Sequence, residues 1–196
     1  MLDEEIAEGA ASARPRRLDF QRPLFLQQER RLTAAERGTA MHLVMQYLEL
    51  GGPDPEEQVR RLTDRRLLTP QQAEAVDMER IRAFLATPLA QEIRQARQVW
   101  REYRFALLMP AALYDPAAEG EELMLQGVVD CAFRTEEGLV VVDFKTDRLA
   151  PGEEPQRAEE YRPQLEAYAQ ALERVMEEKV CRKVLYFFST GATINL

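Results

Sequence analysis

After residue 31 the chain carries hydrophobic residues at helical spacing. Leu32-Thr33-Ala34-Ala35-Glu36 has the pattern of a capping box, with Thr33 as N-cap and Glu36 at position N3. The predicted helix ends at Gly51-Gly52 and places four apolar side chains on one face: Met41, Val44, Met45 and Leu48. Further helices are predicted over residues 55–67, from Thr69-Pro70 to about residue 85, and over about residues 89–97.

From residue 99 onward the pattern becomes that of β-strands. Strands are predicted over residues 99–109, 122–135 and 139–143, and Glu136-Glu137-Gly138 is good turn material between the last two. Residues 147–157, with two prolines and a glycine, predict a loop. A long amphipathic helix comes next and carries Tyr161, Leu165, Tyr168, Leu172 and Val175. It is followed by an apolar strand over residues 183–189 and a short terminal strand after Gly191.

The order of these elements, helices and then β-β-β-α-β, predicts an α/β (α+β) fold. We expect one domain over residues 32–196, with a helical part over 32–98 and a β-β-β-α-β core over 99–196. Residues 1–31 show no sustained period and contain two prolines, so we expect a linker or a wrapping arm there.

Composition indicates an ordinary globular protein, with 45% hydrophobic and 31% charged residues among 196. No apolar run approaches the ~20 residues that span a bilayer, and the acidic N-terminus is unlike a signal peptide. We therefore expect a cytoplasmic protein with no membrane association. Cys131 and Cys181 are too few for a four-cysteine zinc or iron–sulfur site, and we expect both to be buried.

The net charge of -8 is unexpected for a chain that binds nucleic acid by itself. Such domains normally have a basic surface, because they bind phosphates. Two explanations stay open: the acids form part of a metal site, or another domain delivers the nucleic acid.

The predicted hairpin over residues 125–147 carries two aspartates and a lysine. Side chains alternate along a strand, so Asp143 and Lys145 point to one face and Phe144 to the other. Asp-x-Lys after an apolar strand is common, and alone it indicates a solvated strand end. Asp130 on the neighbouring strand changes this interpretation, because two close carboxylates repel unless a cation or proton intervenes. The set suits a divalent cation and metal-assisted phosphodiester hydrolysis.

Two other residues are candidates for the same site. Glu102, on the preceding strand, is a third acid or an exposed glutamate paired with Arg101 or Arg104. His42 is the only histidine, and a lone histidine beside an apolar face is more often a half-buried structural residue. Gly38, one turn earlier on the same helix face, would leave open space beside the imidazole.

The long helix offers a last pair of candidates. Gln164 and Tyr168 are spaced i, i+4 and share one helix face, although a core tyrosine and a surface glutamine would show the same spacing. No Walker A sequence, Cys/His zinc pattern, Gly-x-Ser-x-Gly elbow or dinucleotide fingerprint occurs in the chain. These absences argue against nucleotide, zinc and serine hydrolysis within this sequence.

Five segments between about residues 33 and 190 form an ordered set. They are Gly38-Thr39-Ala40-Met41-His42, Glu102 on its strand, Gln126-Gly127-Val128-Val129-Asp130, Val142-Asp143-Phe144-Lys145-Thr146 and Tyr161-Arg162-Pro163-Gln164-Leu165-Glu166-Ala167-Tyr168. In this order they resemble the RecB-family nuclease domain of the PD-(D/E)XK superfamily. The resemblance implies a restriction-endonuclease-like core, with a central mixed sheet flanked by helices and an N-terminal helical layer.

The resemblance also implies roles for individual residues. His42, Asp130, Asp143 and the backbone carbonyl of Phe144 would bind Mg²⁺ or Mn²⁺. Lys145 would orient the attacking water and stabilise the developing charge, with Asp130, Asp143 and Glu102 as further catalytic residues. Gln164 and Tyr168 would support the site and touch the DNA strand.

The implied activity is that of a Mg²⁺-dependent deoxyribonuclease, an exonuclease acting in double-strand-break repair and homologous recombination. It would digest single-stranded DNA fed by a helicase domain upstream in the same polypeptide, together with an AddB-like subunit, which would explain the acidic charge. Two alternatives remain: a non-catalytic DNA-binding or scaffold module of the same fold, and a stand-alone exonuclease of the superfamily. The scaffold module should have lost an acid or the lysine, and all are present.

Overall fold

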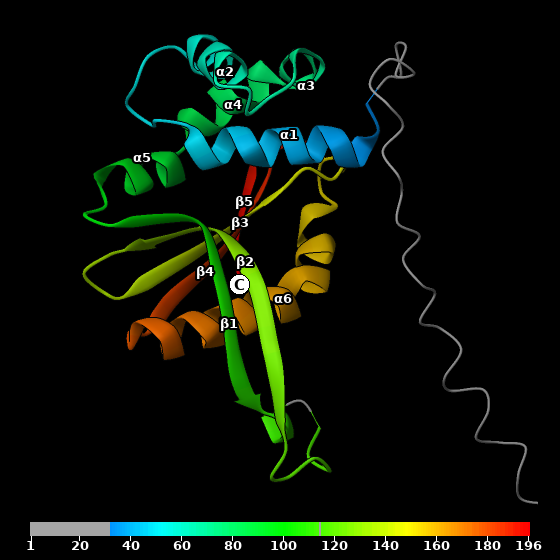
Figure 1. Ribbon diagram of the computed structural model, residues 1–196, viewed down its shortest axis with the longest axis vertical. Helices are drawn as coiled ribbons and strands as arrows, with labels where there is room; N and C mark the ends of the chain where they lie inside the picture. The colour runs from blue at the N-terminus through cyan, green and yellow to red at the C-terminus, as the bar shows by residue number, and fades with distance from the viewer. Residues whose placement is uncertain (1–31, 114) are drawn as a thin grey trace, which may run out of the picture. The chain divides into compact units, whose positions relative to one another are not determined.

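Five strands form one mixed sheet in the order β1-β2-β3-β4-β5 (Figure 1). In this computed structural model the described residues are 32–113 and 115–196, so the arm expected over residues 1–31 lies outside them. The β1–β2, β2–β3 and β4–β5 pairs are antiparallel, whereas β3 and β4 are parallel. The strands are β1 (Val99–Pro110), β2 (Glu122–Arg134), β3 (Leu139–Lys145), β4 (Val180–Phe187) and β5 (Ala192–Asn195).

Helices cover the two faces of this sheet. Five of them precede the strands and gather on one side, while the long helix α6 (Glu154–Met176) crosses over between β3 and β4 and packs against the other (Figure 1). The five are α1 (Ala34–Tyr47), α2 (Pro55–Asp64), α3 (Pro70–Ala75), α4 (Met78–Leu85) and α5 (Pro88–Gln95). The mixed sheet flanked by helices, with its N-terminal helical layer, is confirmed.

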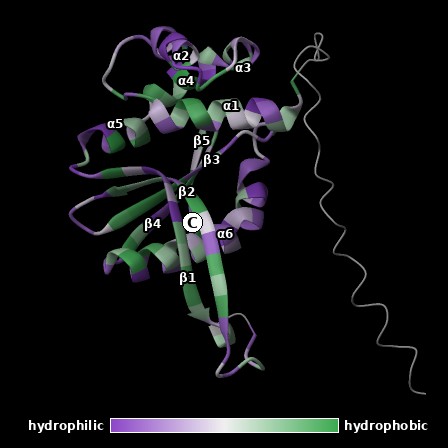
Figure 2. Cartoon of the chain, viewed as in Figure 1, coloured by the Kyte–Doolittle hydropathy of each residue, from purple (hydrophilic) through white to green (hydrophobic). Residues whose placement is uncertain are grey.

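Each face of the sheet has its own hydrophobic core, because alternate residues of a strand point to opposite sides. Val140 and Val142 belong to the large core under α1–α5, whereas Val141 between them packs with Leu172 of α6. A smaller cluster joins Leu165 of α6 to β4. The central strands are mainly green in Figure 2, and the helices alternate green with purple, as amphipathic covering helices do.

Local capping signals explain most helix starts. The Thr33–Glu36 capping box is present, with reciprocal hydrogen bonds of 3.2 and 2.7 Å. The single helix predicted up to about residue 85 is wrong, because the chain forms α3 and α4 instead. Val76 adopts an extended conformation, and the side chain of Asp77 accepts a hydrogen bond from the backbone N–H of Arg80 to cap a new helix.

Three smaller predictions need correction. The second helix ends at Asp64 rather than residue 67, since Arg66 has a positive φ of 59°. The loop expected to reach residue 157 ends earlier, because Pro155 lies in the first turn of α6, where its missing N–H costs nothing. Cys131 is buried as expected, and burial raises the pKa of its thiol to about 12, but Cys181 is exposed at the less covered start of β4.

The β1–β2 hairpin is longer than the sheet to which it belongs. The two strands pair from Val99 opposite Phe133 to Pro110 opposite Glu122, but β2 pairs with β3 only over its last four residues. The outer part is therefore a two-stranded ribbon that projects beyond the rest of the sheet (Figure 1). None of the helices in the described segments is long and apolar enough to cross a membrane.

An aromatic cluster anchors the helical layer to the sheet and gives a stability test. Phe84 of α4 is fully buried, with ring centroids 4.9 Å from Tyr186 and 5.3 Å from Phe144. Phe84→Ala should lower the free energy of unfolding in urea by about 3–5 kcal/mol, because it leaves a cavity. Met124→Ala, at a side chain that is 67% exposed, should change it by less than about 0.5 kcal/mol. Equal losses in the two variants would contradict this packing.

Candidate active site

The candidate site lies where β2 separates from β3. Their ladder runs from Arg134 opposite Leu139 to Cys131 opposite Val142 and has no further rung. At the next position the carboxylate of Asp130 accepts the backbone N–H of Phe144, at 2.7 Å to Oδ2. A side chain thus replaces the main-chain partner, which satisfies the amide and lets β2 leave the sheet at this point.

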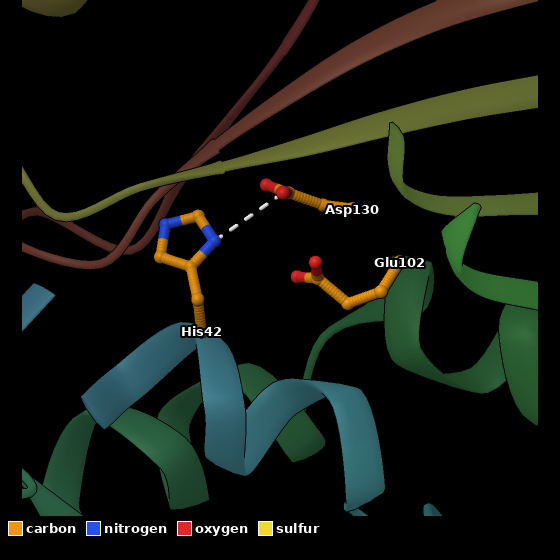
Figure 3. Close-up of side chains that lie close together, drawn as sticks. All are labelled: His42, Glu102 and Asp130. Carbon is orange, nitrogen blue, oxygen red and sulfur yellow. Dashed lines mark ion pairs between the residues drawn. The ribbon is translucent and has the colours of Figure 1, made fainter. Parts of the chain in front are cut away.

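His42 reaches Asp130 from the helical layer. Its Nδ1 lies 3.3 Å from Oδ1 of Asp130, and Figure 3 shows the imidazole rising from α1 toward that carboxylate. Burial of its neighbours Met41 and Val44 against the sheet fixes the side of α1 that faces the strands. The open space expected beside Gly38 is not there: a Cβ at that position would lie 2.9 Å from Oγ1 of Thr146, so glycine permits a close approach of α1 to the end of β3.

Glu102 completes a triad with His42 and Asp130. Ligand atoms of the three side chains all lie within 4.8 Å of one another, and they point toward a common space (Figure 3). Glu102 is opposite Asp130 in register, yet the pair forms no rung, and its φ is 49°. A left-handed conformation costs a residue other than glycine about 1–2 kcal/mol, so the backbone holds this carboxylate in place against its own preference.

The alternative for Glu102, an ion pair with a neighbouring arginine, does not occur among the described residues. The guanidinium of Arg101 instead donates to the carbonyls of Met45, at 2.9 Å, and Leu48. These carbonyls lie at the C-terminal end of α1, where a cation is favoured by the helix dipole. Arg101 therefore fastens α1 to β1 beside the triad.

Asp143 lies outside the triad and pairs with Lys145, as their alternation along β3 predicts. Asp143 is 4% exposed, and its Oδ2 is 2.6 Å from Nζ of Lys145. Burial and the negative charge of Asp130 raise the pKa of Asp143 to about 6, although Lys145 and His42 oppose the rise. Oδ2 accepts no hydrogen bond of good geometry from the described residues, so this buried oxygen retains bonding capacity for a further ligand.

Lys145 is held on several sides. Besides Asp143, its Nζ donates to Oε1 of Gln164 at 3.0 Å and lies 3.6 Å from the ring centroid of Tyr161. Gln164 donates in turn to the hydroxyl of Tyr168 at 2.7 Å, so the i, i+4 pair does act together on the face of α6 toward the site. The ammonium is therefore fixed by an anion, an amide and an aromatic face.

Sequence reasoning named Tyr161 only as part of a helix face and missed its contact with Lys145. Its hydroxyl donates to Oδ2 of Asp147 at 2.5 Å and accepts from Arg157 at 3.0 Å. Burial and the bond to Asp147 raise the pKa of Tyr161 to about 12. The available signal was its spacing, since Tyr161 precedes Gln164 by three residues and so shares its face.

Negative charge dominates the electrostatics of the triad. Burial lowers the pKa of His42, but the bond to Asp130 and the charges of Asp130, Asp143 and Glu102 outweigh it, so the net shift is upward. Burial and Asp130 likewise raise the pKa of Glu102. The rise at His42, against the effect of burial, shows that the carboxylates of the cluster favour a positive charge there.

The donor set fits a divalent cation. One imidazole and two carboxylates converge within 4.8 Å, which matches ligands on a sphere of roughly 2–2.6 Å radius. A set dominated by oxygen suits Mg²⁺ or Mn²⁺ better than a structural zinc. Two further ligands stay predictions: the carboxylate of Asp143, which has unused bonding capacity, and the backbone carbonyl of Phe144.

The fold and the site together define a class: an α/β protein with an acid cluster and a lysine at a break in its sheet.

The sequence comparisons identify the family. Residues 12–194 match the PD-(D/E)XK nuclease superfamily, and the chain belongs to it. Nucleases of this superfamily use divalent metals.

Curated relatives are named as ATP-dependent helicase/nuclease subunits. The one from Acetivibrio thermocellus is 44% identical over 179 residues, which is 89% of this chain and 14% of the relative. Those from Heliobacterium modesticaldum and Bacillus velezensis are 41% and 37% identical, over 89% and 90% of this chain and 13% and 15% of their own length. The chain thus spans about one seventh of the proteins it resembles.

Substitutions of the two aspartates should affect stability differently in the metal-free protein. Folding raises the pKa of Asp143 from an ordinary value of 3.8 to about 6, so its charged form destabilises the fold above pH 6. That penalty shrinks as the pH falls from about 6 and is absent below 3.8. Asp143→Asn should therefore be more stable than wild type in EDTA at pH 7, by at most about 3 kcal/mol, with the difference fading toward pH 4.

Asp130→Ala is the matched comparison for that measurement. It removes a carboxylate but also leaves the Phe144 amide without its acceptor, so it should be less stable than Asp143→Asn at pH 7. Urea denaturation at pH 4 and pH 7 measures both. A destabilised Asp143→Asn at pH 7 would show that the ion pair with Lys145 outweighs burial and repulsion.

Proposed function

We propose that the chain is a Mg²⁺- or Mn²⁺-dependent DNA nuclease, the nuclease part of an AddA-type helicase–nuclease of double-strand-break repair and recombination. The observation that carries the proposal is the convergence of His42, Glu102 and Asp130 beside the buried pair of Asp143 and Lys145. Membership of a nuclease superfamily and the likeness to helicase/nuclease subunits support it.

In this proposal His42, Asp130 and Asp143 hold the ion, with the Phe144 carbonyl as a further oxygen and Glu102 as an additional acid. The ion would activate a water molecule and stabilise negative charge on a phosphate. The protein's own contribution is to fix the ligands before binding: Asp130 by the Phe144 amide, His42 by α1, and Glu102 by its left-handed backbone.

Lys145 has the second role in the proposal. Its ammonium, 13% exposed at the side chain and held by Asp143 and Gln164, would stabilise the charge that develops on the phosphate and orient the attacking water. Gln164 and Tyr168 would keep the lysine in position and contact the strand. A fixed cation needs no reorganisation during the reaction, which is why its immobility matters.

The substrate in this proposal is single-stranded DNA, cut without sequence preference as an exonuclease. No base-reading motif occurs in the sequence, and phosphate contacts carry no sequence information. With a net charge of -8 the chain should bind DNA weakly, in the range of about 10⁻⁴–10⁻⁶ M or worse at physiological salt. A helicase domain of the same polypeptide and an AddB-like subunit would deliver the strand in the cytoplasm.

The decisive experiment is cleavage of end-labelled single-stranded DNA by the purified chain. Activity should require Mg²⁺ or Mn²⁺, vanish in EDTA and return when the metal is restored. Asp130→Asn and Asp143→Asn should abolish cleavage, whereas Glu137→Gln, in the exposed turn between β2 and β3, should cut like wild type. Undiminished cleavage in EDTA would exclude the metal mechanism, and complete inactivity with every metal would favour a non-catalytic scaffold.

Lys145 can be separated from the metal ligands. Lys145→Met should lower turnover by roughly 10²–10³-fold, the loss found when a fixed transition-state donor is removed. Mn²⁺ binding measured by calorimetry should be kept or slightly strengthened, because a nearby positive charge is gone. Asp143→Asn is the control that should weaken Mn²⁺ binding. A variant of Lys145 that no longer binds Mn²⁺ would instead make the lysine a structural residue.

A further inference from the structure

A groove of about 600 Å³ lies beside the candidate active site, along the N-terminal half of α1. Its walls come from α1, from the α3–α4 region and from the segment that follows β3, which includes Thr146, Asp147 and Arg148. A volume of this size is typical of ligand-binding clefts. Nothing in the proposed chemistry uses it.

The groove is lined by chain neighbours of two site residues. Gly38 and Met41 line it on α1, and His42 follows Met41 on the same helix. On the opposite wall Thr146 follows Lys145 in the chain. The two walls approach closely at one point, where a Cβ at Gly38 would lie 2.9 Å from Oγ1 of Thr146. A strand whose phosphate lies at the site would therefore have its neighbouring phosphates near the groove.

The charge of the groove differs from that of the whole chain. It is lined by three arginines and two aspartates, and both aspartates are already compensated. Asp77 is 3.0 Å from Nε of Arg80, and Asp147 accepts hydrogen bonds from Tyr161 and Arg157. Arg80 is consequently neutralised by its own partner.

The other two arginines remain available. Arg148 is exposed and forms no salt bridge within the described segments of the chain. Arg37 donates through one nitrogen to the carbonyl of Leu32 at 2.8 Å, which is a neutral acceptor, and it has no carboxylate partner there either. Two cations thus face a cleft whose carboxylates are already paired, in a protein of net charge -8.

We propose that this groove binds the DNA backbone next to the scissile phosphate, with Arg37 and Arg148 contacting phosphates of the same strand. The inference rests on the proposed nuclease function and specifies on which side of the metal ligands the strand runs. The two arginines act as binding residues and take no part in the bond-breaking step. Guanidinium groups suit this task, because their planar donors match phosphate oxygens.

The test is the salt dependence of DNA binding by the 196-residue chain, with fluorescein-labelled dT12 in EDTA so that no cleavage occurs. Arg148→Gln and Arg37→Gln should each weaken binding roughly 3- to 10-fold at low salt, as for the loss of one solvent-exposed hydrogen bond. The plot of the logarithm of the binding constant against the logarithm of the salt concentration has a negative slope. Each substitution should make that slope shallower by about 0.7, the value for one phosphate contact on a single strand. In Mg²⁺ both should raise KM for dT12 and leave kcat unchanged.

Two controls separate the groove from general effects of charge and folding. Arg60→Gln removes the same charge from an exposed position of α2 outside the groove and should keep the wild-type slope. Arg37→Lys keeps the charge and should keep the wild-type slope. A shallower slope in this variant would mean that Arg37 acts through its hydrogen bond to the Leu32 carbonyl instead.

The outcomes also distinguish this inference from the proposed function. Suppose that the wild type cleaves DNA but both groove variants keep the wild-type slope, or that Arg60→Gln changes the slope as much as they do. The groove would then not bind the strand, whereas the proposed nuclease function would be unaffected. A wild-type chain that neither cleaves nor binds dT12 would overturn both.

Discussion

The hydrogen bond from the Phe144 amide to the Asp130 carboxylate is the contact on which the site depends. It takes the place of a ladder rung at the point where β2 leaves β3, so a single side chain both ends the pairing and remains within reach of His42. The same position lacks a rung toward β1, where Glu102 takes its left-handed conformation. The break in both ladders gives the acids a shared space that a regular sheet, with side chains alternating between faces, would not provide.

The elements of the fold were predictable because they depend on local signals: helical spacing, the Thr33 capping box and the alternation that put Asp143 beside Lys145. The end of α3 before Asp77 was not predicted, because the hydrophobic pattern continues at helical spacing while the Asp77 side chain caps a new helix, α4. The positive φ of Glu102 and the approach of Gly38 to Thr146 could not be predicted, since each arises where segments distant in sequence meet. The ordered motifs located the candidate site, but its supporting contacts are tertiary.

The local distribution of charge matters more in this protein than its overall balance. The net charge of -8 includes a cluster of buried or half-buried acids, and burial together with the charge of Asp130 raises the pKa of Asp143 and Glu102. Their negative charge raises the pKa of His42, and it is offset by Lys145, whose position Gln164 and Tyr161 fix from α6. A folded domain tolerates such an arrangement because two hydrophobic cores, one on each face of the sheet, supply the stability.

The two cysteines differ in their access to solvent, and this difference makes opening of the sheet measurable. Cys131 follows Asp130 in the chain, is buried and has a thiol pKa of about 12, so a thiol reagent reaches it only when this part of the sheet opens. Cys181 is exposed and reacts from the folded state. The difference between the two labelling rates therefore reports how often β2 parts from its neighbours, beside the residue whose side chain bonds to β3.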